Sequence, residues 1–229
     1  MQILKAIGLL MEYPDEFLWQ CKEEVLAMVR HDAPMLNDFV AEMLNAPLLD
    51  KQAEWCEVFD RGRATSLLLF EHVHAESRDR GQAMVDLLAQ YEKAGLQLNC
   101  RELPDHLPLY LEYLSILPEN EAREGLQNVA PILALLGGRL KQREVAWYPL
   151  FDALLSLAGS PLSSDSVTKQ VNQESRDDTR QALDAVWEEE QVKFFADQNC
   201  GESEIAAHQR RFAGAVAPQY LNISNGGRH

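Results

Sequence analysis

Residues 119–143 read ENEAREGLQNVAPILALLGGRLKQR, and their apolar side chains recur at intervals of three and four. This spacing places one apolar stripe along an α-helix. The stripe consists of Ala122, Leu126, Val129, Ala130 and Leu133. Proline disrupts a helix interior, so Pro131 predicts a kink or a helix boundary near Ala130. The stretch as a whole predicts a long helix with one side against a core.

The same periodicity extends outward in both directions from this stretch. It recurs in residues 84–91, 107–114 and 147–158, whereas no segment of comparable length alternates with period two. Leucine occurs 34 times, against 22 for valine, isoleucine and threonine together, which favours helix over sheet. Helices are expected at about residues 2–12, 14–30, 34–45, 50–60, 64–75, 78–94, 105–116, 119–143, 147–158, 166–174 and 179–195.

Turn and capping residues indicate how these helices are separated. Pro14, Pro34 and Pro149 stand where first helical turns would begin, and Gly95 follows the 84–91 stripe as a C′ glycine does. From Asp197 onward the apolar period is lost. We therefore predict an all-α, single-domain helical bundle of about ten helices over residues 1–195, with a flexible C-terminal tail over residues 196–229.

Composition excludes several classes of protein. The chain has 229 residues, 36 acidic and 21 basic, and a formal charge of −15. This acidity disfavours nucleic-acid binding and favours basic partners. No uncharged stretch reaches the roughly 20 residues of a membrane span, and no secretory signal is visible, so we expect no membrane insertion. Four widely spaced cysteines are expected to be reduced thiols in a cytoplasmic protein.

Catalytic motifs are missing from the sequence. There is no P-loop, no G-x-G-x-x-G, no G-x-S-x-G and no H-E-x-x-H. His72 and His74 could be metal ligands, but positions i and i+2 of a helix point about 200° apart, so a surface position is favoured. The run Glu188–Glu190 is interpreted first as a solvated face. Arg61 and Arg63, around Gly62, are interpreted as turn residues that could form ion pairs.

The most unusual string is LPDHLPLY, residues 103–110, in which two prolines bracket Asp105 and His106. One interpretation makes Asp105 the N-cap of a helix whose first turn contains Pro108. The other uses the same turn to present a carboxylate and an imidazole to a ligand. Spacing alone favours the cap.

With this string the sequence resembles the delta-subunit assembly chaperones of respiratory nitrate reductase (NarJ/NarW type), within the redox-enzyme maturation chaperones that include TorD and DmsD. The resemblance covers nearly the whole chain. Its most specific blocks are residues 57–88, 102–114 and 177–194. The front and the tail resemble different paralogues, so the paralogue stays open.

The resemblance implies an all-α chaperone without enzymatic activity or a stably bound cofactor. Its partner would be the N-terminal peptide of the nitrate reductase catalytic (alpha) subunit, held until the molybdenum cofactor and an iron–sulfur cluster are inserted and before membrane docking; molybdenum cofactor delivery proteins would be further partners. The group's Pro-Asp-His motif falls on Pro104, Asp105 and His106. Its Tyr-x-x-Leu-Phe-type segment matches residues 55–59 loosely, because Trp55 and Val58 depart from it.

Residues and resemblance together predict that a peptide helix lies in an apolar groove near Asp105, with its basic end toward the acidic surface. The expected peptide-binding residues are Phe59, Arg61, Phe70, Asp105, His106, Tyr110 and Tyr113. Two alternatives remain: a cofactor or metal carrier using His72, His74, His106 and the thiols, or a structural subunit of the reductase complex.

Overall fold

All regular structure in the described part of the chain is helical. The computed structural model describes residues 1–73, 78–98, 102–185 and 187–188, and it divides into two compact units, residues 1–179 and 180–229. Apart from one isolated antiparallel bridge between Leu68 and His106, the described residues contain no strand pairing. The predicted all-α class is confirmed. In the second unit, residues 180–185 and 187–188 are helical, and the predicted tail over residues 196–229 lies outside the described residues.

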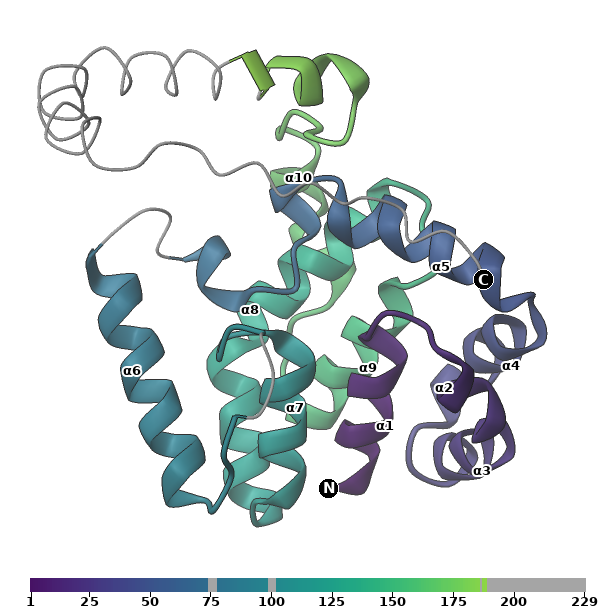
Figure 1. Cartoon of the computed structure of the whole chain (residues 1–229), viewed down its shortest axis with the longest axis vertical. Coiled ribbons are helices and arrows are strands. Elements are labelled where there is room, and N and C mark those ends of the chain that lie inside the picture. The colour runs from purple at the N-terminus through teal and green to yellow at the C-terminus, as the bar shows by residue number, and fades with distance from the viewer. Residues whose placement is uncertain (74–77, 99–101, 186, 189–229) are drawn as a thin grey trace, which may run out of the picture. The chain divides into compact units, whose positions relative to one another are not determined.

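The first unit contains ten α-helices in its described residues (Figure 1). They are α1 (Gln2–Met11), α2 (Glu16–Gln20), α3 (Lys22–Asp32), α4 (Asn37–Asn45), α5 (Leu48–Trp55), α6 (Arg78–Lys93), α7 (Leu107–Ile116), α8 (Glu119–Gln142), α9 (Tyr148–Ala158) and α10 (Thr168–Val171). Short 3₁₀ turns cover Pro34–Leu36, Arg63–Thr65, Leu69–His72 and Ser164–Val167, and a π-helical turn covers Cys56–Asp60.

The core forms where α1 packs beside α7 and α8 packs beside α9 (Figure 1). Ala122, Leu126, Ala130 and Leu133 of the predicted stripe on α8 are buried. Two glycines allow close approaches within this core. A Cβ at Gly8 would lie 3.3 Å from the Pro108 carbonyl oxygen, and one at Gly137 would overlap the Ser164 hydroxyl.

Two helix predictions are wrong, and the boundary that was one alternative at Pro131 does not occur. The helix predicted over residues 14–30 is divided at Cys21 into α2 and α3. No helix boundary occurs at Pro131, because residues on both sides of it in α8 are buried and their packing exceeds the roughly 3 kcal/mol cost of a helical proline. The predicted 64–75 helix is replaced by two 3₁₀ turns, because the backbone of residues 67–69 pairs with residues 105–107 instead.

The cap predicted for Asp105 is also wrong. The N-cap of α7 is His106, and the Asp105 carboxylate accepts a hydrogen bond from the Phe70 backbone N–H at 2.9 Å. Pro108 does lie in the first turn of α7, as predicted. Gly95 also ends α6 as predicted, with a φ of 81°.

The packing around glycines predicts opposite effects for one substitution at two sites. Gly137→Ala should lower the free energy of unfolding by about 1–3 kcal/mol, because the new methyl group overlaps Ser164. Gly81→Ala, in α6 with open space around it, should raise it by about 0.4–1 kcal/mol. Urea denaturation of both variants beside the wild type tests this, and equal effects at the two sites would contradict the packing described here.

Candidate functional site

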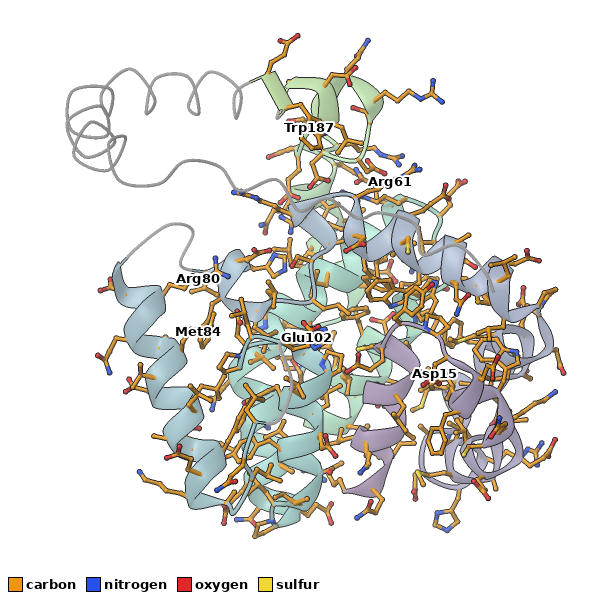
Figure 2. The ribbon with its side chains drawn as sticks, viewed as in Figure 1. Asp15, Arg61, Arg80, Met84, Glu102 and Trp187 are labelled. Atoms are coloured by element: carbon orange, nitrogen blue, oxygen red, sulfur yellow. The ribbon has the colours of Figure 1, made fainter. Side chains whose placement is uncertain are left out.

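A cavity of about 260 Å³ lies beside the turn that contains Asp105 and His106. We call it the aromatic cavity. Its lining comes from the residues after α1, the end of α5 with the π-helical turn, the 67–68 segment and the segment leading into α7. These residues are Glu12, Tyr13, Trp55, Phe59, Asp60, Leu67, Leu68, Glu102 and His106. Figure 2 shows Glu102 on the segment that leads into α7.

Aromatic rings connect this cavity to the core. The Tyr13 and Trp55 rings meet edge to face with centroids 5.5 Å apart, Trp55 and Phe59 are 5.6 Å apart, and Phe59 and Trp147 are 5.5 Å apart. Trp147 is almost fully buried, and the Trp55 indole N–H donates to the Met11 carbonyl at 2.8 Å. The aromatic wall is therefore held in position before any ligand arrives.

The π-helical turn Cys56–Asp60 explains why Trp55, Phe59 and Asp60 line one cavity. In a regular α-helix a residue five positions along points about 140° away from the first. The wider turn, closed by i→i+5 hydrogen bonds, brings Asp60 to the same side as Trp55 and Phe59. The Thr65 hydroxyl, which donates to the Val58 carbonyl, fastens this turn to the next segment. A carboxylate thereby joins an aromatic wall.

The Pro-Asp-His turn forms the opposite wall through its backbone. Leu69 N–H donates to the Asp105 carbonyl at 3.0 Å, and Leu107 N–H donates to the Leu67 carbonyl at 2.8 Å. The Tyr91 hydroxyl donates to the Pro104 carbonyl at 2.7 Å. These bonds fix Leu67 and Leu68 beside His106 at the cavity.

Asp105 lies behind this wall. Its exposed fraction is 0%, its Oδ2 accepts the Phe70 N–H, and its Oδ1 has no hydrogen-bond partner among the described residues. Burial raises the pKa of Asp105, against the opposing effects of the Phe70 N–H and Arg80. The Asp105 side chain therefore positions the Leu67–Phe70 segment rather than facing the cavity.

The cavity rim carries three carboxylates, from Glu12, Asp60 and Glu102, and no lysine or arginine of the described residues lines it. Burial, reinforced by Glu102 and other carboxylates, raises the pKa of Glu12. Burial lowers the pKa of His106, whose Nδ1 lies 4.0 Å from Glu12 Oε1 and has no hydrogen-bond partner in the described structure. The arrangement suits an apolar side chain accompanied by a positive charge.

The structure brings only some of the predicted site residues together. Phe59 and His106 line the aromatic cavity, with Asp105 behind it. Phe70 is half-buried against the core next to Asp105. Arg61 lines a different cavity of about 260 Å³, where its guanidinium lies 3.5 Å from Glu57, and Figure 2 shows it well apart from Glu102.

The two predicted tyrosines belong to a separate cluster. Tyr113 lies between Tyr91 and Tyr110, with ring centroids 4.9 Å and 6.1 Å away. The Tyr110 hydroxyl donates to the Gly125 carbonyl, and burial raises its pKa to about 12. Neither Tyr110 nor Tyr113 lines the aromatic cavity.

Sequence reasoning missed most of the rim. Glu12 ends the predicted 2–12 helix and Tyr13 lies between it and the helix predicted from residue 14, so neither was predicted to line the site. Asp60 is the last residue of the predicted 50–60 helix and Trp55 departs from the family pattern, so neither was predicted to line the site. The usable signal was composition: three aromatic side chains at positions 55, 59 and 70 bracket a segment with a charged turn.

Two further findings bear on the class of site. The described residues contain no group of three or more His, Cys, Asp and Glu side chains placed to hold a metal ion. Both ring nitrogens of His72 face partners within the chain, Ser66 O at 2.9 Å and Arg139 at 3.4 Å, while His74 lies outside the described residues. Among the described helices, none combines the length and hydrophobicity that crossing a bilayer requires.

The chain belongs to the nitrate reductase delta subunit family, whose model matches residues 22–153. The matched range contains Trp55, Phe59, the 67–68 segment and the Pro-Asp-His turn. This confirms the resemblance that the motifs suggested.

Individual relatives are similar over the whole chain. Over 229 residues, covering 99% of each chain, it is 78% identical to the probable nitrate reductase molybdenum cofactor assembly chaperone NarW of Escherichia coli (strain K12). It is 63% identical over 233 residues, again 99% of each chain, to the nitrate reductase molybdenum cofactor assembly chaperone NarJ of the same strain. A probable NarJ of Bacillus subtilis (strain 168) is 25% identical over 167 residues, 66% of this chain and 85% of the relative.

The buried carboxylate predicts a pH-dependent difference between the wild type and Asp105→Asn, which keeps a hydrogen-bond acceptor but removes the charge. Because the native pKa is raised above its usual 3.8, the folded protein holds this proton to a higher pH than the unfolded chain does. The wild type should therefore lose unfolding free energy relative to Asp105→Asn as pH rises from about 4 through the native pKa.

Chemical denaturation of both proteins at pH 4 and pH 7 measures this difference. A wild type that gains stability relative to Asp105→Asn over this interval would contradict the described environment. Asp105→Ala, which also removes the acceptor for Phe70 N–H, should be destabilised by about 1–3 kcal/mol at pH 4 and by less at pH 7.

Proposed function

We propose that this chain is a nitrate reductase molybdenum cofactor assembly chaperone that binds the N-terminal peptide of the apo catalytic (alpha) subunit. It holds that subunit competent for insertion of the molybdenum cofactor and an iron–sulfur cluster before membrane docking. It acts in the cytoplasm, without enzymatic activity or a stably bound cofactor, and has molybdenum cofactor delivery proteins as further partners. Its similarity to NarW and NarJ assembly chaperones supports the chaperone role, and the aromatic cavity with its acidic rim supports peptide binding.

The cavity favours a peptide over the cofactor itself. Its volume of about 260 Å³ is below the range of about 300–1,000 Å³ typical of sites that enclose small molecules, and the molybdenum dinucleotide cofactor is larger than most such ligands. Three rim carboxylates would also repel the phosphates of a dinucleotide. An apolar peptide side chain with a neighbouring cation matches both the size and the charge of the cavity.

An amphipathic peptide helix docked by a few anchors gives reversible binding. Burying three or four apolar side chains supplies about 1.5–3 kcal/mol each. Ordering the peptide takes back about 2–5 kcal/mol or more, and the loss of overall freedom takes back more. An affinity near the micromolar level follows, which allows release once assembly is complete. The charges mainly accelerate encounter, so binding weakens as salt rises.

Tyr13 and Phe17 offer a matched test of the cavity. Tyr13 is 48% exposed and lines the cavity, whereas Phe17 is 59% exposed and does not. Tyr13→Ala should weaken binding of a synthetic peptide of about 15 residues, four helical turns from the catalytic subunit's N-terminus, by about tenfold. Phe17→Ala should leave the affinity unchanged. Isothermal titration calorimetry at low salt measures both.

Thermal melting of each variant controls for folding. A folded wild type that binds no peptide would refute peptide recognition and favour the structural-subunit or cofactor-carrier alternative. Equal losses in the two variants would refute the aromatic cavity as the site while leaving peptide binding intact.

A further inference from the structure

A second, smaller cavity of about 60 Å³ lies between α1 and α7. Its lining residues are Lys5, Gly8, Leu9, Glu12, Pro108, Leu109 and Glu112. It exists where the two helices approach closely, since Gly8 faces the Pro108 carbonyl with no side chain between them. Leu9 and Leu109 are half-buried and give this cavity an apolar surface. We call it the helix-pair cavity.

Glu12 lines both cavities. Its position follows from the end of α1: Met11 is the last helical residue, and the chain then turns toward Tyr13 and the aromatic wall. The His106 ring, at the start of α7, lies 4.0 Å from its carboxylate. One half-exposed carboxylate therefore marks the junction of two apolar hollows.

Among the described residues no lysine or arginine pairs with Glu12, and burial lowers the pKa of the neighbouring His106, which disfavours its positive charge. Lys5, which lines the same small cavity, is bonded instead to Glu112 at 3.0 Å. The carboxylates of Asp15, Glu102 and Glu112 all act on Glu12, and together with burial they raise its pKa. A cation supplied from outside would relieve this repulsion.

We infer that Glu12 binds a lysine or arginine side chain of the client peptide, and that this cation stands between two apolar side chains, one in each cavity. The inference rests on the proposed peptide binding and adds the residue that pairs with the peptide's positive charge. It also defines the recognised pattern as apolar, cationic, apolar along one face.

A helical peptide can present this pattern. Residues three or four positions apart share one helix face, with Cβ atoms about 5–6 Å apart. An apolar residue, a cation one turn later and a second apolar residue one turn further therefore form one continuous edge. The larger side chain enters the aromatic cavity, and a smaller one fits the helix-pair cavity. An ammonium or guanidinium group gains a charge-assisted hydrogen bond at a partly desolvated carboxylate.

A double-mutant cycle tests the cation. Calorimetry at low salt compares wild type and Glu12→Gln against the same N-terminal peptide, in which each lysine or arginine is replaced in turn by glutamine. Glu12→Gln should weaken binding about three- to tenfold, less at high salt. One peptide replacement should cause a similar loss in the wild type and little further loss with Glu12→Gln. The control is Glu92→Gln, the same change at an exposed position of α6, and it should bind the peptide as the wild type does.

The helix-pair cavity has its own matched pair on α7. Leu109→Ala should weaken binding about threefold, because it removes the apolar surface that the second anchor covers. Ile116→Ala, on the same helix, 50% exposed and lining neither cavity, should leave the affinity unchanged.

The outcomes distinguish failure of the inference about Glu12 and the second anchor from failure of the proposed peptide binding. Wild-type binding that Glu12→Gln does not weaken, or losses that are additive for every peptide cation, overturns the role of Glu12 while the proposed function stands. Wild-type binding with Leu109→Ala unchanged overturns the second anchor. A folded wild type that binds no peptide overturns the proposed function and the inference together.

Discussion

Two backbone hydrogen bonds between residues 67–69 and 105–107 join parts of the chain that are far apart in sequence and fix how their buried leucines pack. They pair a segment without regular helix against the turn that begins α7, and the Asp105 carboxylate adds a third bond to Phe70. If this pairing were lost, Leu67 and Leu68 would have no fixed position and the aromatic cavity would have one wall. The hydrogen bond to Phe70 resists a local shift of this segment, because a shift that left Asp105 buried would leave its acceptor without a partner.

This pairing also explains why the cavity is preformed. Its other wall depends on a ring-to-ring path from Tyr13 to the buried Trp147, and the two walls meet at His106 and Glu12. A peptide that docks there loses conformational entropy, but the residues of the cavity are already ordered. Preorganisation of this kind raises affinity by removing part of the entropy cost of binding. A small cavity can then hold a flexible segment at useful affinity.

The helices whose apolar residues recur with helical spacing could be predicted from the sequence. A segment whose backbone hydrogen-bonds to a distant part of the chain could not. The apolar stripes placed α7, α8 and α9 within a few residues. The 64–75 helix was wrong because its leucine run makes strand-like hydrogen bonds to a turn about 38 positions away, which no local pattern encodes. Asp105 was assigned to the wrong partner for the same reason: a cap is local, whereas Phe70 is 35 residues away. Phe59 and His106 were found at the site, but Glu12 and Tyr13 reach it only through the end of α1.

The excess of acidic residues acts locally at this site, where several carboxylates lie near Glu12. A formal charge of −15 destabilises any compact state through self-repulsion, and most acidic side chains reduce that cost by facing solvent. Glu12 does so only in part, since it lies half-buried near other carboxylates, and Lys5 of the same cavity is paired with Glu112. A helix end without function would be more stable with a neutral side chain there. The unfavourable placement is consistent with selection for binding, because a cationic ligand turns a local cost in the free protein into a gain in the complex.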